Sequence, residues 1–333
     1  MANNQQVLIE HLPEGKLQAS DYRLSEAPVP EPQADEVLCE TIAFAITAGT
    51  RAGLQGSASY AGAPRTGIVM NATGVARVIA SRSDAFKEGD VVLGPTGWQT
   101  HAALPAAGLT HVPAQDDPLH YLGPLGVNGL TAYFGLNEVG APEPGNTVLV
   151  SAAAGSVGHL VGQFAAARGA RAVGLSSSDA KCDVLTSRLG FAAAVNYRED
   201  NFRSALKEAT PDGVDVYFDN TGGPLLGAAL FRMNVGGRIS CCGVVSQYDT
   251  DRPEPGPKGI PGLLVNKRLT MRGFLVFDFA PRYDEARAQI RSWLADGSVV
   301  SLTDEVNGLA AAPDAFVDLL AGGNVGTRIV RLA

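Results

Sequence analysis

A short apolar strand that runs into a turn of small residues constrains this chain most strongly. Residues 147–151 read Thr-Val-Leu-Val-Ser, and residues 152–158 read Ala-Ala-Ala-Gly-Ser-Val-Gly. A helical pattern over residues 157–168 follows at once and is closed by Gly169. A second apolar run begins at residue 171, so the sequence predicts a β-α-β unit with parallel strands.

The turn matches the G-x-G-x-x-G pattern of dinucleotide-binding sites, with Ala153, Gly155 and Gly158 at its three fixed positions. Alanine then occupies the tight turn, Gly155 allows the backbone to approach a pyrophosphate, and Gly158 allows close packing of helix and sheet. The helix start, which includes Ser156 and Val157, offers backbone N–H groups to phosphates. The alternative is an ordinary strand-turn-helix that needs small residues only for packing.

The end of the second strand, residues 171–175, bears on the choice of cofactor. An acidic residue there would bind the adenosine ribose and repel a 2′-phosphate, but Ser176 begins a run of three serines. The following Asp179 lies where an N-cap residue or a first-turn acid of a helix belongs, and we interpret it as capping. The serines leave room for a phosphate that Lys181 can reach, which favours NADP over NAD. A solvated helix lysine is the alternative for Lys181.

Length and composition set the outer bounds. A chain of 333 residues that is 45% hydrophobic predicts two domains with an ample core. The net charge of −8 and the absence of a Lys/Arg cluster argue against a nucleic-acid or anionic membrane partner. Residues 1–10 lack the pattern of a signal peptide, and no apolar run reaches the roughly 18 residues of a membrane helix. Four cysteines favour free thiols, so we expect a cytoplasmic protein.

The pattern of elements predicts two domains. Residues 1–125 are rich in Pro, Gly and short β-type runs, which predicts a compact β-rich domain to which residues 300–333 return. In residues 126–299 helices alternate with strands, which predicts a Rossmann-type doubly wound parallel sheet. We expect helices at 131–139, 157–168, 179–189 and 314–320, and strands at 36–42, 74–79, 90–93, from 98, near 147, 171 and 194, and at 214–219, 238–244, 269–276 and 327–331.

This layout resembles the medium-chain dehydrogenase/reductase superfamily, in which a β-rich GroES-like catalytic domain precedes a Rossmann NADP-binding domain. Local motifs make the chain similar to the zinc-independent alkenal/one oxidoreductases, a branch that includes prostaglandin reductases, plant double-bond reductases and bacterial curcumin reductase. The resemblance covers nearly the whole chain. Its motifs are GLTAY at 129–133, SAAAGSVG at 151–158, GF at 190–191, NY at 196–197, YFDNTGG at 217–223, CGVVSQY at 242–248, GFLVF at 273–277 and GNVG at 323–326.

The resemblance implies NADPH as the cofactor and assigns residues to it. Lys181 and Tyr197 resemble the residues that hold the adenosine 2′-phosphate. Tyr248 resembles a tyrosine near the substrate carbonyl and is the predicted catalytic residue, with a loop tyrosine over the core as the alternative. For Tyr197 and Asn220 the alternative is ordinary turn chemistry. Tyr248 is also predicted to contact the cofactor, and the other predicted cofactor-binding residues are Asn220, Gly243, Ser246, Phe274, Leu275, Val276 and Asn324.

The chain lacks the ligand patterns of zinc-dependent relatives, since it has no Gly-His-Glu after the first strands and no Cys-x-x-Cys repeat. We therefore expect no metal, and His159 lies instead in the phosphate-binding helix. Without zinc to activate an alcohol, the implied reaction is reduction of an activated C=C bond. Hydride passes from NADPH to the β-carbon of an α,β-unsaturated aldehyde or ketone, and the α-carbon is then protonated. Tyr248 would stabilise the enolate oxygen.

One motif departs from the family pattern. Many members carry Asp-Pro-Tyr-Met-Arg after an early strand, whereas residues 47–51 read Thr-Ala-Gly-Thr-Arg. Gly49 in place of tyrosine predicts a roomier substrate pocket. Arg51 is retained, and we interpret it as part of a domain-packing ion pair.

Two other functions stay open. The same scaffold serves NADPH-dependent quinone or carbonyl reductases, and it also serves non-catalytic NADPH-binding proteins. The expected partner is a small-molecule enal or enone. The family resemblance also implies a homodimer, and the strand near 269–276 could pair across its two-fold axis.

Overall fold

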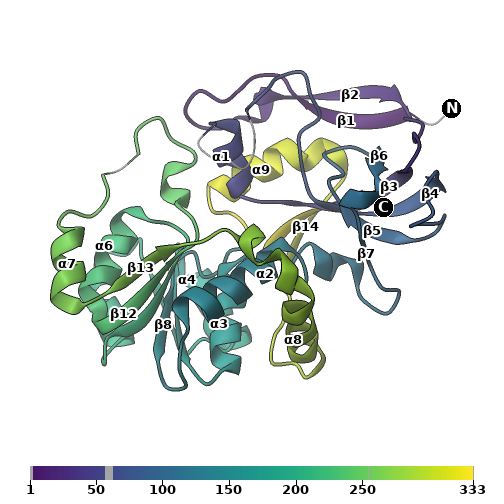
Figure 1. The fold of residues 1–333 in the computed structure, drawn as a ribbon. Coiled ribbons are helices and arrows are strands. Elements are labelled where there is room, and N and C mark those ends of the chain that lie inside the picture. Colours follow the sequence, from purple (N-terminus) through teal and green to yellow (C-terminus); the bar gives the residue numbers. More distant parts are fainter. Residues whose placement is uncertain (1–2, 57–62, 254, 333) are drawn as a thin grey trace. The chain divides into compact units, whose positions relative to one another are not determined.

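The computed structural model describes residues 3–56, 63–253 and 255–332. The chain divides into two compact units, of which unit 1 comprises Met1–Gly123 with Thr303–Ala333 and unit 2 comprises Pro124–Leu302. Figure 1 shows the elements of both units in the colours of the sequence.

Unit 2 is built on a six-stranded sheet in the order β10-β9-β8-β11-β12-β13, and every pair in it is parallel. This order corresponds to the 3-2-1-4-5-6 arrangement of doubly wound sheets, which confirms the predicted Rossmann architecture. The strands are β8 (Thr147–Val150), β9 (Arg171–Ser176), β10 (Ala193–Asn196), β11 (Val214–Asp219), β12 (Met233–Cys241) and β13 (Thr270–Gly273).

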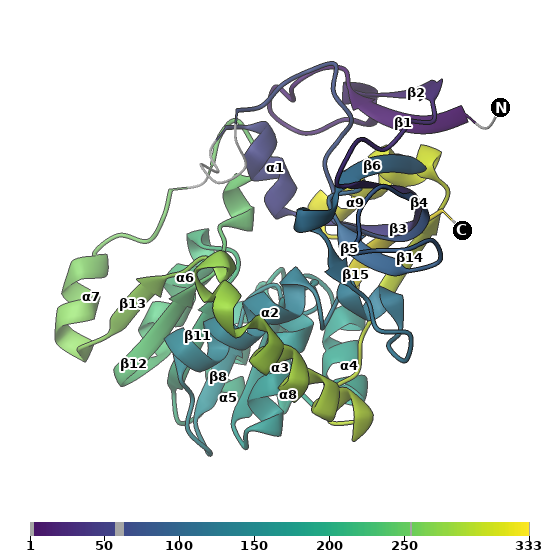
Figure 2. The ribbon, with the colours of Figure 1, turned by 45° about the vertical axis from the view of Figure 1, so that its right-hand side comes forward.

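Helices cover both faces of this sheet. Side chains of α5, α6 and α7 belong to one buried cluster that also contains Val173 and Leu175 of β9. Gly174 lies between these two residues and faces the opposite side, where a Cβ atom would lie 2.7 Å from Leu185 of α4. Helix α3 packs on β8 and β9 with α2 and α8 beside it (Figure 2). The helices are α2 (Val127–Phe134), α3 (Gly158–Ala167), α4 (Asp179–Arg188), α5 (Phe202–Ala209), α6 (Gly223–Arg232), α7 (Ile260–Lys267) and α8 (Tyr283–Ala295), with a π-helix η5 (Gly135–Gly140) and 3-10 helices η6 (Val245–Gln247) and η7 (Val276–Arg282).

Unit 1 contains a seven-stranded sheet in the order β14-β15-β3-β4-β5-β7, with β6 also paired to β3, and a separate β1-β2 hairpin. Strand β15 pairs antiparallel with β3, so the C-terminal segment completes the sheet of the N-terminal residues. The elements are β1 (Asn3–Ile9), β2 (Tyr22–Pro28), β3 (Glu36–Ile46), α1 (Gly49–Leu54), β4 (Gly74–Ser81), β5 (Val91–Gly94), β6 (His101–Pro105), β7 (Thr110–His111), β14 (Thr303–Asn307), α9 (Ala312–Leu320) and β15 (Thr327–Arg331), with short 3-10 helices at Ala19–Asp21, Ala106–Gly108, Pro118–Tyr121 and Leu309–Ala311.

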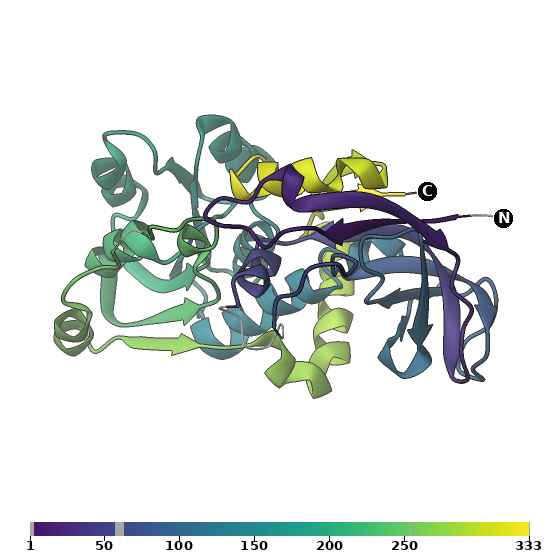
Figure 3. The ribbon, with the colours of Figure 1, turned by 90° about the horizontal axis from the view of Figure 1, so that it is seen from above.

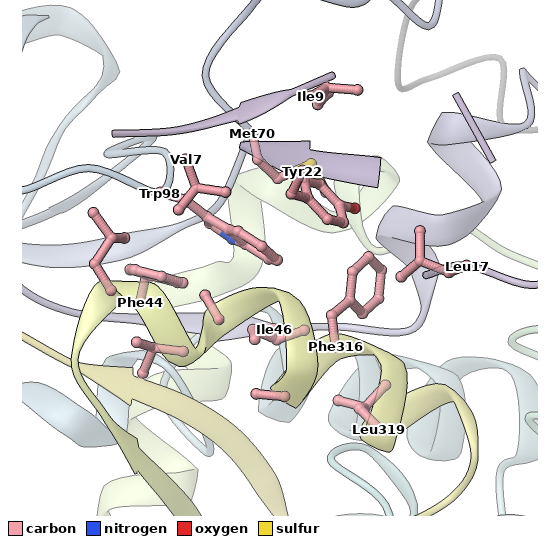
Figure 4. Close-up of a cluster of buried hydrophobic side chains, with 14 of the residues drawn as sticks. Val7, Ile9, Leu17, Tyr22, Phe44, Ile46, Met70, Trp98, Phe316 and Leu319 are labelled. Carbon is pink, nitrogen blue, oxygen red and sulfur yellow. The ribbon is translucent and has the colours of Figure 1, made fainter. Parts of the chain in front are cut away.

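Trp98 lies at the centre of the unit 1 core, as Figure 4 shows. Its ring is stacked on Phe44 at 5.7 Å between centroids and meets the edge of Phe316 at 6.0 Å. Phe316 belongs to α9, the yellow helix that lies along the purple N-terminal strands in Figure 3. Burial of these aromatic rings therefore joins the two ends of the chain in one core.

Several element boundaries differ from the predicted ones for tertiary reasons. The helix predicted at 131–139 begins at Val127, and from Gly135 it continues as a π-helix whose first carbonyl accepts a bond from Ser240 Oγ at 2.9 Å. The strand predicted at 238–244 begins earlier, at Met233, and ends at Cys241, since the next N–H groups turn back to the Asp219 carbonyl. The last strand of this sheet ends at Gly273. The strand predicted from residue 98 begins at His101.

Candidate functional site

The turn between β8 and α3 is stabilised by backbone hydrogen bonds. The Gly155 N–H donates to the Ala152 carbonyl at 2.9 Å, and the Ala153 N–H donates to Leu175 at the end of β9 at 3.0 Å. Ala152 has a φ of 47°, in the left-handed region. The strained residue of the tight turn is therefore Ala152 and not Ala153, which instead ties the turn to the neighbouring strand.

Gly158 stands where the helix comes closest to the turn. A Cβ atom at this residue would lie 2.3 Å from the Ala152 carbonyl oxygen and 2.8 Å from the Ala153 Cα. At Gly155 the nearest atom would be the same Ala152 oxygen, at 3.2 Å. The predicted close packing at Gly158 is therefore observed, and it places the start of α3 directly over the end of β8.

A buried polar network joins the ends of β8 and β11, between which the strand order of the sheet reverses. The Asn220 N–H donates to Ser151 Oγ at 2.9 Å, and Asn220 Nδ2 donates to the Ser151 carbonyl at 2.8 Å. Ligands of doubly wound sheets bind at this switch point. The predicted residue Asn220 therefore lies at the expected end of the sheet, held by Ser151, a residue to which sequence reasoning assigned no role.

Asp219 organises the loop that follows β11. Its Oδ1 accepts bonds from the Tyr217 hydroxyl at 3.0 Å and from the Gly222 N–H at 2.8 Å. Burial, together with the nearby Asp219 carboxylate, raises the pKa of Tyr217 well above its ordinary value, so the phenol stays a neutral donor. The signal that could have identified Asp219 is its place as the last residue of a mostly apolar strand, before Asn-Thr-Gly-Gly.

The ends of β9 and β10 bring together the residues assigned to the 2′-phosphate end. Ser176 is buried, and its carbonyl accepts a bond from the Tyr197 N–H at 3.0 Å. Ser178 is the N-cap of α4, since its side chain accepts a bond from the Lys181 N–H at 3.4 Å. Of the two positions that the sequence allowed for Asp179, the structure shows the first-turn acid, and its interpretation as the cap was wrong.

Asp179 is a first-turn acid whose Oδ1 accepts a bond from Asn196 Nδ2 at 3.0 Å. Its carboxylate is thus engaged with the neighbouring strand end. The end of β9 itself presents the small, neutral Ser176.

The loop after β12 carries the next group of predicted residues. The Val244 N–H donates to the Tyr248 hydroxyl oxygen at 3.3 Å, and Ser246 Oγ donates to the Thr221 carbonyl at 2.6 Å. A Cβ atom at Gly243 would lie 3.2 Å from the Asn220 carbonyl oxygen. The structure therefore brings Gly243, Ser246 and Tyr248 beside the loop of Asn220.

The residues that follow β13 differ in how far their side chains are buried. The Phe274 ring packs edge-on against Phe218, with 6.4 Å between centroids, and closely approaches Gly135. Leu275 is 42% exposed, whereas Val276 is buried. The backbone of this segment thus runs past the end of the sheet with one side chain facing outward.

Three of the predicted residues belong to unit 1. Asn324 is buried, and its Nδ2 donates to the Gly326 carbonyl at 2.8 Å. Gly49 begins α1, and a Cβ atom there would meet no described atom within 4 Å. Arg51 is fully buried, and its Nη2 donates to the Gly15 carbonyl at 2.5 Å, which indicates a packing role within unit 1.

Other site chemistries can be judged only over the part of the chain that the structure describes. There, no cluster of three or more His, Cys, Asp or Glu side chains is arranged to hold a metal ion. None of the helices in that part has the length and apolar character needed to cross a membrane. The four cysteines are free thiols, and burial raises the pKa of Cys242 to about 12, so this thiol is a weak nucleophile at neutral pH.

Comparison with known proteins identifies the family. Residues 5–112 match the N-terminal domain of oxidoreductases, and residues 156–292 match the zinc-binding dehydrogenase family. The chain is 42% identical over 277 residues to the NADP(+)-dependent 2-alkenal reductase of Nicotiana tabacum, covering 82% of this chain and 78% of that protein. It is 33% identical over 335 residues to the NADPH-dependent curcumin reductase of Escherichia coli, covering 99% and 97%.

A solved structure supports the same assignment. The crystal structure of CurA from Vibrio vulnificus in complex with NADPH matches with a TM-score of 0.94 at 33% identity and covers 99% of each chain. Similarity in sequence and in fold thus extends over both units. The chain belongs to the medium-chain dehydrogenase/reductase superfamily, in the branch of NADP-dependent oxidoreductases that includes the alkenal and curcumin reductases.

Proposed function

We propose that the protein is an NADPH-dependent reductase that reduces the C=C bond of α,β-unsaturated aldehydes and ketones. The relatives that are most informative about chemistry are a 2-alkenal reductase and a curcumin reductase. The observation that carries the proposal is that the Tyr248 loop follows β12 and lies beside Asn220 at the switch point. The carboxyl ends of parallel strands meet at one edge of a sheet, so this loop shares an edge with the phosphate-binding turn.

The residues of unit 2 fit an NADPH molecule. The turn has small residues at Ala153, Gly155 and Gly158, and the start of α3 with Ser156 and Val157 offers backbone N–H groups to a pyrophosphate.

The end of β9 fits the 2′-phosphate of this cofactor. It carries the small Ser176, and the nearby Asp179 is engaged with Asn196. Lys181 and Tyr197 would hold the 2′-phosphate there, with the Lys181 ammonium as its charged partner. The further proposed contacts are Asn220, Gly243, Ser246, Phe274, Leu275, Val276 and Asn324.

Bound NADPH supplies the hydride, and Tyr248 stabilises the charge that develops on the substrate oxygen. A phenol that accepts one hydrogen bond keeps an O–H group that can donate. The Val244 N–H holds the Tyr248 oxygen from one side, which limits the rotation of the ring. A donor aimed at the developing enolate is worth a few kcal/mol in the transition state.

Gly49 belongs to the proposed substrate pocket. No described atom lies within 4 Å of the place that a Cβ atom at Gly49 would take. This open space supports a pocket that accepts larger enones than a pocket with tyrosine at this residue would accept. The proposed substrate is thus a small-molecule enal or enone whose bulk is accommodated near α1.

We also propose that two copies of the chain associate through β13. This strand is the last of the six-stranded sheet, and among the described residues its outer edge pairs with no strand (Figure 2). Beyond it Phe277 is 56% exposed, and Val265 of α7 is 73% exposed. An exposed edge with apolar neighbours favours pairing with another edge.

Product identity tests the proposed reaction. We expect NADPH to be oxidised in the presence of enals and enones, and the products, identified by mass spectrometry and NMR, to be saturated carbonyl compounds. Allylic alcohols or quinols with the C=C bond intact would favour a carbonyl or quinone reductase instead. NADPH binding without turnover over the whole panel would favour a non-catalytic protein.

The substitution Tyr248→Phe tests the role of the hydroxyl. We expect kcat/KM to fall about 100-fold because a transition-state donor is lost, while the Kd for NADPH stays within about twofold. Tyr121→Phe is the control, since that hydroxyl donates to Asp116 Oδ2 at 2.8 Å within unit 1. Unchanged kcat/KM in Tyr248→Phe would remove this tyrosine from the mechanism.

The substitution Lys181→Met tests the 2′-phosphate site. Loss of a charge-assisted hydrogen bond is expected to raise the Kd for NADPH about 10- to 100-fold. The Kd for NADH should not change, because NADH has no 2′-phosphate. Lys207→Met on the exposed side of α5 is the control and should affect neither cofactor. An equal loss for both cofactors would contradict this role for Lys181.

The substitution Phe277→Glu tests the β13 interface. In analytical ultracentrifugation the wild-type protein should sediment as a dimer of 34.5 kDa chains, and the variant should sediment as a monomer, because a buried carboxylate is costly. Leu24→Glu, on a side chain that is 52% exposed in β2, should remain a dimer. A monomeric wild-type protein would refute the interface.

A further inference from the structure

His159 is a buried histidine next to the phosphate-binding turn, and the proposed reaction does not use it. It is the second residue of α3 and has no exposed surface. Its Nδ1 lies 2.9 Å from the Gly155 carbonyl oxygen, and its Nε2 lies 3.4 Å from the Leu302 nitrogen. The imidazole thus has a distinct partner on each side.

These two partners determine which nitrogen carries the proton. A carbonyl oxygen can only accept, so Nδ1 must be protonated, and a backbone N–H can only donate, so Nε2 must be the acceptor. Burial is the largest cause that lowers the pKa of His159 to about 4, against the opposing effect of the Gly155 and Ser156 backbone. The side chain is therefore a neutral, oriented imidazole at physiological pH.

The Gly155 carbonyl receives two hydrogen bonds from this one residue. The His159 backbone N–H donates to it at 3.1 Å and the Nδ1–H at 2.9 Å. Because a peptide unit is planar and trans, the direction of the Gly155 carbonyl sets the opposite direction for the Ser156 N–H. That N–H belongs to the helix start that we assign to the pyrophosphate.

Gln163 lies one turn further along α3 and provides a comparison. Its Oε1 accepts a bond from the Val300 N–H at 2.7 Å, and its Nε2 donates to the Val300 carbonyl at 3.0 Å. His159 and Gln163 therefore both hold the segment that ends unit 2 at Leu302, before β14 begins at Thr303. Of the two side chains, only that of His159 also forms a hydrogen bond with the phosphate-binding turn, at the Gly155 carbonyl.

We propose that His159 is a positioning residue for the phosphate-binding turn. Its Nδ1–H holds the Gly155 carbonyl and thereby orients the adjoining peptide for the pyrophosphate of NADPH. The inference rests on the proposed function, since it requires NADPH at this turn.

Two amide substitutions separate the two hydrogen bonds of the imidazole. In His159→Asn the side-chain amide comes near the position of Nδ1 and keeps a donor toward Gly155, but it cannot reach Leu302. In His159→Gln the amide reaches the position of Nε2 and keeps an acceptor toward Leu302, but it loses the donor at Gly155. The two variants bury the same functional group at the same residue, so they differ mainly in which bond survives.

The measurement is the Kd for NADPH and, separately, for adenosine 2′-monophosphate, which lacks the pyrophosphate. We expect His159→Gln to raise the NADPH Kd about tenfold and His159→Asn to leave it within about threefold. Adenosine 2′-monophosphate should bind both variants as it binds the wild-type protein. Gln163→Met removes the two bonds to Val300 and the bond from Nε2 to the His159 carbonyl, but it leaves the imidazole itself in place. It should lower the melting temperature without changing either Kd.

Four results would overturn the proposal. The first is an NADPH affinity of His159→Gln equal to that of the wild-type protein, and the second is an equal loss of affinity for both ligands in this variant. The third is a loss of NADPH affinity in Gln163→Met that matches the loss in His159→Gln. The fourth is a tenfold loss of NADPH affinity in His159→Asn. The last result decides the matter even where His159→Gln does not fold. A wild-type protein that fails to bind NADPH would refute the proposed function itself, which is visible before any variant is compared.

Discussion

The close approach of α3 to the end of β8 is the constraint on which unit 2 depends. A Cβ atom at Gly158 would lie 2.3 Å from the Ala152 carbonyl oxygen, so only glycine allows the helix to begin there. Ala152 accepts a left-handed conformation to make the turn this short. The helix start consequently faces the end of its own strand, and the Ala153 N–H reaches across to β9.

The neighbouring strand ends are organised around that turn by buried polar groups. Ser151 and Asn220 join β8 to β11, while the Asp219 carboxylate gathers donors from Tyr217 and the loop before α6. Buried polar groups are costly unless they are hydrogen-bonded, so such a network is strongly directional. The loops that we assign to the cofactor are therefore held by fixed partners at the carboxyl edge of the sheet, and His159 extends the same principle to the turn itself.

The predicted bounds of helices and strands agree with the structure where local sequence determines them. They differ where contacts between residues far apart in the chain determine them. The strands at 214–219 and 327–331 have the predicted bounds, because each is a short β-type run that is bounded by turn residues. Asp179 is a first-turn acid of α4, and its carboxylate is bonded to Asn196 on the neighbouring strand. The helix at 131–139 changes into a π-helix where Ser240 bonds to its backbone. In the site, the turn and the serine at the end of β9 could be predicted, whereas the partners of Asp219 could not.

The sequence by itself determined the Rossmann architecture and the place of the phosphate-binding turn, because both follow from apolar periodicity and from glycine spacing within about 20 residues. Only the tertiary structure decided which polar groups meet. His159 and Leu302 are 143 residues apart in the chain, and Ser151 and Asp219 are 68 apart. Such pairs depend on strand order, on helix packing and on the path of the chain as it leaves the sheet. A hydrogen bond also requires the donor and acceptor atoms to be placed to within a few tenths of an ångström. No local pattern carries that information.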